Sequence, residues 1–191
     1  MIRNSEYVEE INDGNLFLRK ISKHDADFVF YSLNNEELIS YLSLGPLNTI
    51  EHAKRLIKSY LKYWDNYVQF NYIIELHDVN KERIGSISLW NINWKHRRAQ
   101  IGIWLIPKFW SMGLGEKAIA MIKNIGFNHL KINRLEAYIA IDNERSISLF
   151  KKCGFKEEGK LHQYLNFQGN FYDALVLSCL KKNGFIENLV R

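Results

Sequence analysis

Two glycines, Gly113 and Gly115, stand two residues apart where an apolar segment gives way to a helical pattern. Glycine adopts backbone angles that are closed to other residues, and it lets a backbone come close to a ligand. At the start of a helix, unpaired N–H groups and the positive end of the helix dipole attract anions. The turn is therefore a candidate anion site, and a pyrophosphate is the anion that suits it best.

The residues around this turn exclude two common phosphate-binding motifs. The chain does not match the G-x-x-x-x-G-K-[ST] pattern of the P-loop NTPases, and no further glycine follows at the spacing of the dinucleotide-binding fold. On these residues alone, a glycine turn that merely tightens a strand-to-helix connection remains an alternative. The choice between the two depends on the elements that surround the turn.

A strand with strict alternation follows the helix that this turn opens. Over residues 133–141, one set of side chains is apolar, whereas Glu136, Tyr138 and Ala140 face the other way. The segments at 98–106, 113–130 and 133–141 thus predict a strand, a helix and a second strand. A parallel crossover is natural in this unit. It would place the glycine turn between two neighbouring strands.

The remaining elements are predicted from apolar spacing, caps and turn residues. Further helices are expected over 24–42, over 49–65 with Thr49 as N-cap, and after Asp142 or Asn143 as far as Cys153. Further strands are expected over 15–21, 68–76, 83–91, 155–164 and 170–180. This order predicts an α+β (α/β layered) fold with a mixed, largely antiparallel sheet of about seven strands. We expect one domain over 1–191, with a core over about 15–181.

Composition favours a soluble cytoplasmic protein. The 191 residues are 47% hydrophobic and 25% charged, and no apolar run is long enough for a membrane span. The first ten residues lack the apolar region of a secretory signal. Two cysteines without ligand spacing and six scattered histidines indicate neither a disulfide framework nor a metal site.

The net charge of +5 favours a partner with negative charge, such as a phosphorylated cofactor. The excess is spread over the chain. Aromatic and basic residues alternate only at Trp94–Arg98, so a nucleic-acid partner is not expected.

Several short motifs occur together in a familiar order. Ile101-Gly102-Ile103 is followed by the Trp110–Gly115 turn, then by Asn143-x-x-Ser146 and by Gly154-Phe155. In this combination the chain resembles the GNAT acetyltransferase superfamily, and in particular its ribosomal-protein N-terminal acetyltransferases (the RimJ/RimL-like, or Rim-type, branch). The resemblance runs from about Leu16 to Leu180. It implies helices on both faces of the sheet and acetyl-CoA as cosubstrate, with no metal.

The resemblance also implies a set of cofactor-binding residues. The pantetheine arm would lie along the strand at Ile103, Trp104 and Leu105. Backbone N–H groups of the turn would bind the pyrophosphate, and residues of the following short helix would flank the far side of the cofactor. These two groups are Ser111, Met112, Gly113, Leu114, Gly115 and Glu116 for the turn, and Asn143, Ser146 and Phe150 for the helix.

Three positions depart from the family pattern. Trp110 stands where many members have Gln or Arg at the start of the phosphate loop, although an aromatic residue is common there in the Rim-type branch. Gln100 stands where many have a glutamate, and it cannot act as a general base. Phe150 stands where a tyrosine often acts as the acid, and phenylalanine has no proton to donate. We therefore expect Tyr138 to protonate the leaving thiolate. The proton of the amine is expected to pass through water to Glu136, with Glu75 or a histidine as the alternatives.

The resemblance predicts transfer of an acetyl group to a primary amine by direct attack in a ternary complex. The acceptor expected first is the α-amine of a protein or peptide N-terminus. A polyamine or another small amine, such as an amino sugar, is the alternative. From a different class, a non-catalytic module that binds acyl-CoA or RNA also remains open, because Gln100 and Phe150 lack the family's ionisable groups. We expect no membrane partner and a monomer or homodimer.

Overall fold

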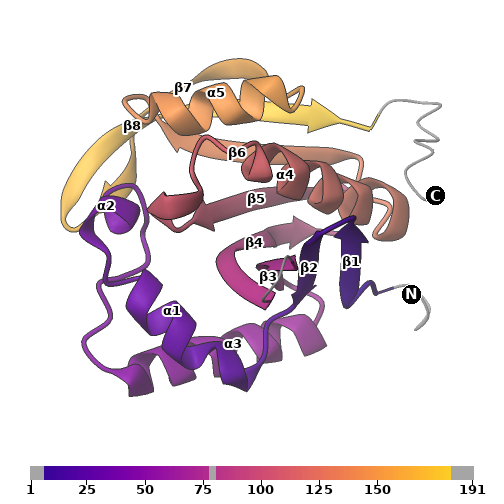
Figure 1. Cartoon of the computed structure of the whole chain (residues 1–191). Coiled ribbons are helices and arrows are strands. Elements are labelled where there is room, and N and C mark those ends of the chain that lie inside the picture. The colour runs from indigo at the N-terminus through magenta and orange to yellow at the C-terminus, as the bar shows by residue number, and fades with distance from the viewer. Residues whose placement is uncertain (1–6, 78–80, 182–191) are drawn as a thin grey trace.

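The residues described by the computed structural model, 7–77 and 81–181, contain eight strands that form one mixed sheet (Figure 1). The spatial order is β1-β2-β3-β4-β5-β6-β8-β7, and every neighbouring pair is antiparallel except β5 with β6. The strands are β1 Glu10–Asp13, β2 Leu16–Lys20, β3 Phe70–His77, β4 Lys81–Asn93, β5 Arg98–Leu105, β6 Arg134–Ala140, β7 Lys156–Phe167 and β8 Asn170–Leu180.

Helices cover both faces of this sheet, as expected (Figure 1). Side chains alternate along β3, so that Ile73 packs with α1 and α3, whereas Tyr72 and Ile74 belong to the core on the side of α4. The helices are α1 Ala26–Ser32, α2 Glu36–Ile39, α3 Ile50–Asp65, α4 Leu114–Asn124 and α5 Glu144–Lys152. Among the described residues, no helix has both the length and the apolar character needed to cross a membrane.

Helix caps confirm several predicted boundaries. The Thr49 hydroxyl accepts a hydrogen bond from the His52 N–H at 3.3 Å, and α3 ends at Asp65. The Asn143 side chain accepts one from the Ser146 N–H at 3.1 Å, and α5 ends before Gly154, whose φ is 84°. The crossover from β5 through α4 to β6 is also confirmed, because these two strands are parallel.

The prediction of one helix over 24–42 is wrong. This segment forms a 3₁₀ turn at Lys23–Asp25, then α1, and then the separate short helix α2. Asn35 interrupts the run, because its side chain accepts a hydrogen bond from the Leu38 N–H at 3.0 Å and so starts a new helix. The apolar spacing continues across this break, which is why periodicity alone did not reveal it.

The sheet has one strand more than the expected seven. The additional strand, β1, has three exposed polar residues and one partly buried apolar residue, Ile11, and therefore no apolar alternation to detect. It pairs with β2 across a tight turn in which Gly14 has a φ of 65°. The connection between the strands predicted over 68–76 and 83–91 lies partly outside the described residues.

A buried carboxylate ties the helical layer to the sheet. The Asp25 side chain is fully buried and accepts hydrogen bonds from both terminal nitrogens of Arg19, at 2.9 and 2.7 Å, and from the Ser22 N–H at 2.8 Å. Arg83 approaches the same carboxylate at 3.4 Å. Burial tends to raise the pKa of Asp25, but the bonds from Arg19 and Ser22 hold this pKa below its usual value.

We predict that Asp25→Asn lowers the free energy of unfolding by about 2–4 kcal/mol at pH 7, because Arg19 then loses the buried one of its two carboxylate partners and keeps only Glu75. Since the folded-state pKa of Asp25 is depressed, its contribution is complete above the unfolded pKa of about 3.9 and disappears as the pH falls further. Urea unfolding at pH 7, 5 and 3 measures this difference. Asp65→Asn, an exposed change at the end of α3, is the control. Equal stability of Asp25→Asn and the wild type at pH 7 would contradict the prediction.

Candidate active site

The strands β5 and β6 are paired at only one end. Their register covers three pairs, from Arg98 with Arg134 to Gln100 with Glu136. Beyond this point β5 still pairs with β4, and β6 still pairs with β8, but the two inner edges separate. Backbone N–H and C=O groups at an unpaired strand edge can bind an extended ligand.

A cavity of about 610 Å³ lies in this gap. Its walls are the diverging parts of β5 and β6, the first residues of α5, and α2 with the segment after it. Figure 1 shows α5 and α2 near the ends of the two strands. The lining includes residues 101–105 from β5 and 137–140 from β6, and Glu37–Leu42 except Ile39 from the α2 region.

The structure brings half of the predicted cofactor-binding residues into this cavity. Those from β5 and α5 line it, namely Ile103, Trp104, Leu105, Asn143, Ser146 and Phe150. The six turn residues, Ser111, Met112, Gly113, Leu114, Gly115 and Glu116, are not among its lining residues. They follow Trp110, which does line the cavity, so the turn begins at its border.

The turn has the geometry of an anion-binding helix start. Ser111 and Gly113 have φ angles of 62° and 75°, in the left-handed region. The Lys117 N–H donates to the Gly113 carbonyl at 3.3 Å, which leaves the N–H groups of the first turn of α4 without helical acceptors. An added Cβ at position 113 would meet no atom within 4 Å, so packing is not the reason for a glycine here. The reason is the positive φ angle, which glycine adopts without strain.

Gly115 has a packing role that sequence reasoning missed. A Cβ at this position would lie 3.1 Å from Cδ2 of Leu149, so the missing side chain lets α4 and α5 pack closely. A bulky residue at 115 would therefore disturb the interface of two helices as well as the turn. If such a variant lost ligand binding, the loss could come from the disturbed helix interface and would not show that residue 115 contacts the ligand.

Phe150 and Asn143 contribute to both cavity and fold. The Phe150 side chain is buried and packs edge-to-face on Phe155, with ring centroids 5.0 Å apart. Asn143 caps α5 through its side-chain oxygen, which leaves its amide nitrogen for other contacts. Because a phenyl ring has no hydrogen-bonding group, Phe150 offers only an apolar surface to the cavity.

The two predicted catalytic residues are in direct contact, but only Tyr138 lines the cavity. The Tyr138 hydroxyl donates to Oε2 of Glu136 at 3.2 Å, at the closed end of the gap. Glu136 is buried, and its carboxylate also accepts hydrogen bonds from Arg134 at 2.6 Å and from Arg98 at 3.2 Å. Both oxygens are thus engaged, which fits a residue that orients the phenol.

Burial raises the pKa of Tyr138, and the negative charge of Glu136 and the hydrogen bond to it raise this pKa further. The phenol therefore carries its proton at neutral pH. The Tyr138 ring also stacks on Tyr164, with centroids 5.1 Å apart. A protonated and fixed hydroxyl at the narrow end of the cavity can act as a proton donor.

Sequence reasoning missed other lining residues. Tyr41, whose hydroxyl lies 3.4 Å from the Asp142 carbonyl oxygen, joins the segment after α2 to the loop before α5. Phe167 contacts Tyr41 from the end of β7. No sequence motif links positions this far apart, so they could not be found from spacing. Arg145 lies within the Asn143-x-x-Ser146 motif and could have been considered as a cation beside a phosphate site.

Comparisons with known proteins place these features in a family. Residues 15–156 match the acetyltransferase (GNAT) domain. The chain is 36% identical over 166 residues to the uncharacterized N-acetyltransferase YoaA of Bacillus subtilis, covering 87% of this chain and 93% of the relative. It is 34% identical over 98 residues to the putative ribosomal N-acetyltransferase YdaF of the same organism, covering 51% and 54%.

A solved structure extends the likeness to the whole fold. The spermidine N-acetyltransferase of Vibrio cholerae, in complex with CoA and spermine, has a TM-score of 0.77 at 26% identity. The alignment covers 87% of this chain and 96% of that protein. The match to the family domain spans most of the chain and includes β5, the glycine turn, α4, β6 and α5. This chain belongs to the GNAT acetyltransferase family.

Proposed function

We propose that the protein transfers the acetyl group of acetyl-CoA to the α-amine of a protein or peptide N-terminus. The observation that carries the proposal is the gap between β5 and β6, which begins at a narrow end beside Tyr138 and leads to the anion-binding turn before α4. A thioester with an extended arm and a distant pyrophosphate fits these three features in this order.

Different residues of the chain contact different parts of the cofactor along this path. Unpaired backbone groups of Ile103–Leu105 hydrogen-bond the pantetheine arm, and the N–H groups of Ser111–Glu116 bind the pyrophosphate. A strand N–H near Ile103 stabilises the oxyanion. The apolar ring of Phe150 packs against the arm near its sulfur.

The transfer needs one proton to leave the amine and one to reach the sulfur. The neutral amine nitrogen attacks the thioester carbonyl carbon, the C–S bond breaks, and the proton of the amine passes to water. The Tyr138 hydroxyl protonates the departing sulfur and is itself reprotonated from water. Glu136 acts as a positioning residue, because it holds the phenol at 3.2 Å and is itself held by two arginines.

The α-amine is favoured because it needs little help to lose its proton. The pKa of an α-amine is about 7.7–8.0, against about 10.4 for a lysine side chain. A larger fraction of α-amines than of lysine side chains is therefore neutral at pH 7. Glu136, the carboxylate nearest to Tyr138 in the sheet, is engaged by Arg98 and Arg134 and lies outside the cavity lining. The likeness to a putative ribosomal N-acetyltransferase supports the same choice.

A specific observation also favours the polyamine alternative. Three carboxylates, those of Glu37, Asp142 and Glu144, line the cavity beside the single cation Arg145. This lining is acidic although the chain carries a net charge of +5, and acidic groups attract a polycation. The structural likeness to an enzyme that binds spermine agrees with it.

We predict that a peptide starting with Ala or Ser is acetylated with a higher kcat/KM than either of two competitors. The competitors are the same peptide with a blocked N-terminus and an internal lysine, and spermidine. Release of free thiol from acetyl-CoA at equal acceptor concentrations measures the three rates. A higher kcat/KM for spermidine or for the blocked peptide would reject the α-amine and, in the first case, establish the polyamine alternative.

We predict that Tyr138→Phe lowers kcat about tenfold to a hundredfold with little change in KM, because only the proton donor is removed. Steady-state kinetics measure both constants, and the lack of a pre-steady-state burst shows that chemistry limits the rate. Tyr164→Phe is the matched control, since this partly exposed tyrosine stacks on Tyr138 and keeps its ring. An unchanged kcat in Tyr138→Phe would remove Tyr138 from the mechanism.

A further inference from the structure

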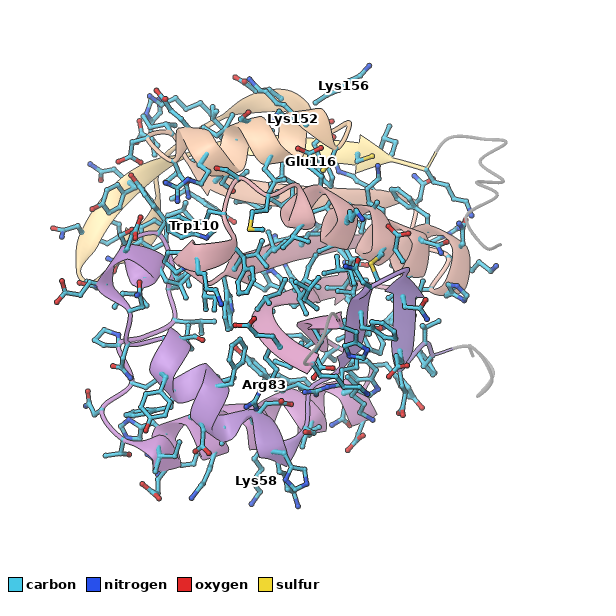
Figure 2. All side chains as sticks on the ribbon, in the orientation of Figure 1. Lys58, Arg83, Trp110, Glu116, Lys152 and Lys156 are labelled. Atoms are coloured by element: carbon cyan, nitrogen blue, oxygen red, sulfur yellow. The ribbon has the colours of Figure 1, made fainter. Side chains whose placement is uncertain are left out.

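An arginine and a tryptophan are in contact where the cavity borders the glycine turn. The guanidinium carbon of Arg145, from the first turn of α5, lies 3.8 Å from the ring centroid of Trp110. The indole N–H of Trp110 donates to the Leu105 carbonyl at 2.6 Å, which fixes the ring at the end of β5. Figure 2 shows Trp110 at this strand end, on the side where α5 lies.

Arg145 places a positive charge in the first turn of α5. A cation in the first turn of a helix faces the positive end of the helix dipole. Among the described residues, no carboxylate lies within ion-pair distance of Arg145, although other basic side chains of α5 have such partners. The guanidinium also lines the cavity. This charge thus lies at the border of the cavity, beside the residue that directly precedes the glycine turn.

We propose that Arg145 binds the pyrophosphate of acetyl-CoA, with Trp110 as the platform that holds its guanidinium in place. The proposal rests on the proposed function, in that it assumes CoA in the gap between β5 and β6. Trp110 directly precedes the turn residues Ser111–Glu116. Arg145, stacked on Trp110, brings a positive charge next to these turn residues.

Stacking and phosphate binding are compatible in arginine. The flat face of the guanidinium rests on the indole ring through a cation–π contact, and its edge still presents N–H donors. Two parallel N–H groups match two phosphate oxygens, which makes the pair stronger than a contact between neutral groups. The pyrophosphate would then lie between the N–H groups of Ser111–Glu116 and the edge of Arg145.

Arg145→Ala tests this role by calorimetry without any acceptor. Three ligands separate the parts of the cofactor, namely CoA, dephospho-CoA, which lacks the 3′-phosphate, and pantetheine, which lacks the nucleotide. We expect the variant to bind CoA and dephospho-CoA about tenfold to a hundredfold more weakly than the wild type does, by the same factor for both. The affinity for pantetheine should not change.

Two further variants complete the experiment. Arg145→Lys should recover part of the lost affinity, because it keeps the charge but not the flat stack. Arg55→Ala removes an exposed arginine of α3, far from α5 (Figure 1), and should bind all three ligands as the wild type does. Raised salt should reduce the difference between Arg145→Ala and the wild type, because an exposed charge is screened.

Distinct results would overturn the inference. Wild-type affinity of Arg145→Ala for CoA rejects any phosphate role, and a loss for CoA but not for dephospho-CoA assigns Arg145 to the 3′-phosphate instead. A loss that extends to pantetheine indicates a packing effect through Trp110, and no recovery in Arg145→Lys rejects the electrostatic role. If the wild type itself binds no CoA, the proposed function fails. If it binds CoA but Arg145→Ala binds equally well, only this inference fails.

Discussion

The early end of the pairing between β5 and β6 is the constraint on which the site depends. After Gln100 and Glu136 the two strands no longer pair, yet each keeps its outer neighbour, so the gap stays open without exposing the sheet elsewhere. The crossover through α4 places the glycine turn at the open end of this gap. At the closed end, the alternation of side chains along β6 places Glu136 and Tyr138 on one face, and their hydrogen bond fixes the phenol.

The sequence predicted much of the fold, because local physics determines it. The capped helices α3 and α5 and the alternating strand β6 appear where caps and periodicity placed them. The errors concern segments in which local signals conflict or vanish. Asn35 starts a new helix inside a continuous apolar pattern, and β1 is too short and polar to alternate.

The residues of the site also fall into those that local sequence predicts and those that it does not. Residues within one motif, such as Ile103–Leu105 and Asn143, were predicted from the resemblance to a known family, whose motifs are local in the sequence, and they line the cavity. Tyr41 and Phe167 line the cavity only because elements far apart in the sequence pack together. The spacing of residues along the sequence does not reveal such packing. Gly115 shows a third case, in which one residue type serves both a ligand-binding turn and the packing of α4 on α5.

The central claim is that CoA lies in the gap between β5 and β6, and a crystal structure of the protein with CoA tests it most directly. The account predicts the pantetheine arm along Ile103–Leu105, hydrogen-bonded to the free edge of β5. It also predicts the pyrophosphate at Ser111–Glu116 and the thiol at the end near Tyr138. A CoA molecule bound elsewhere, or bound in this gap with its thiol directed away from Tyr138, would contradict the account.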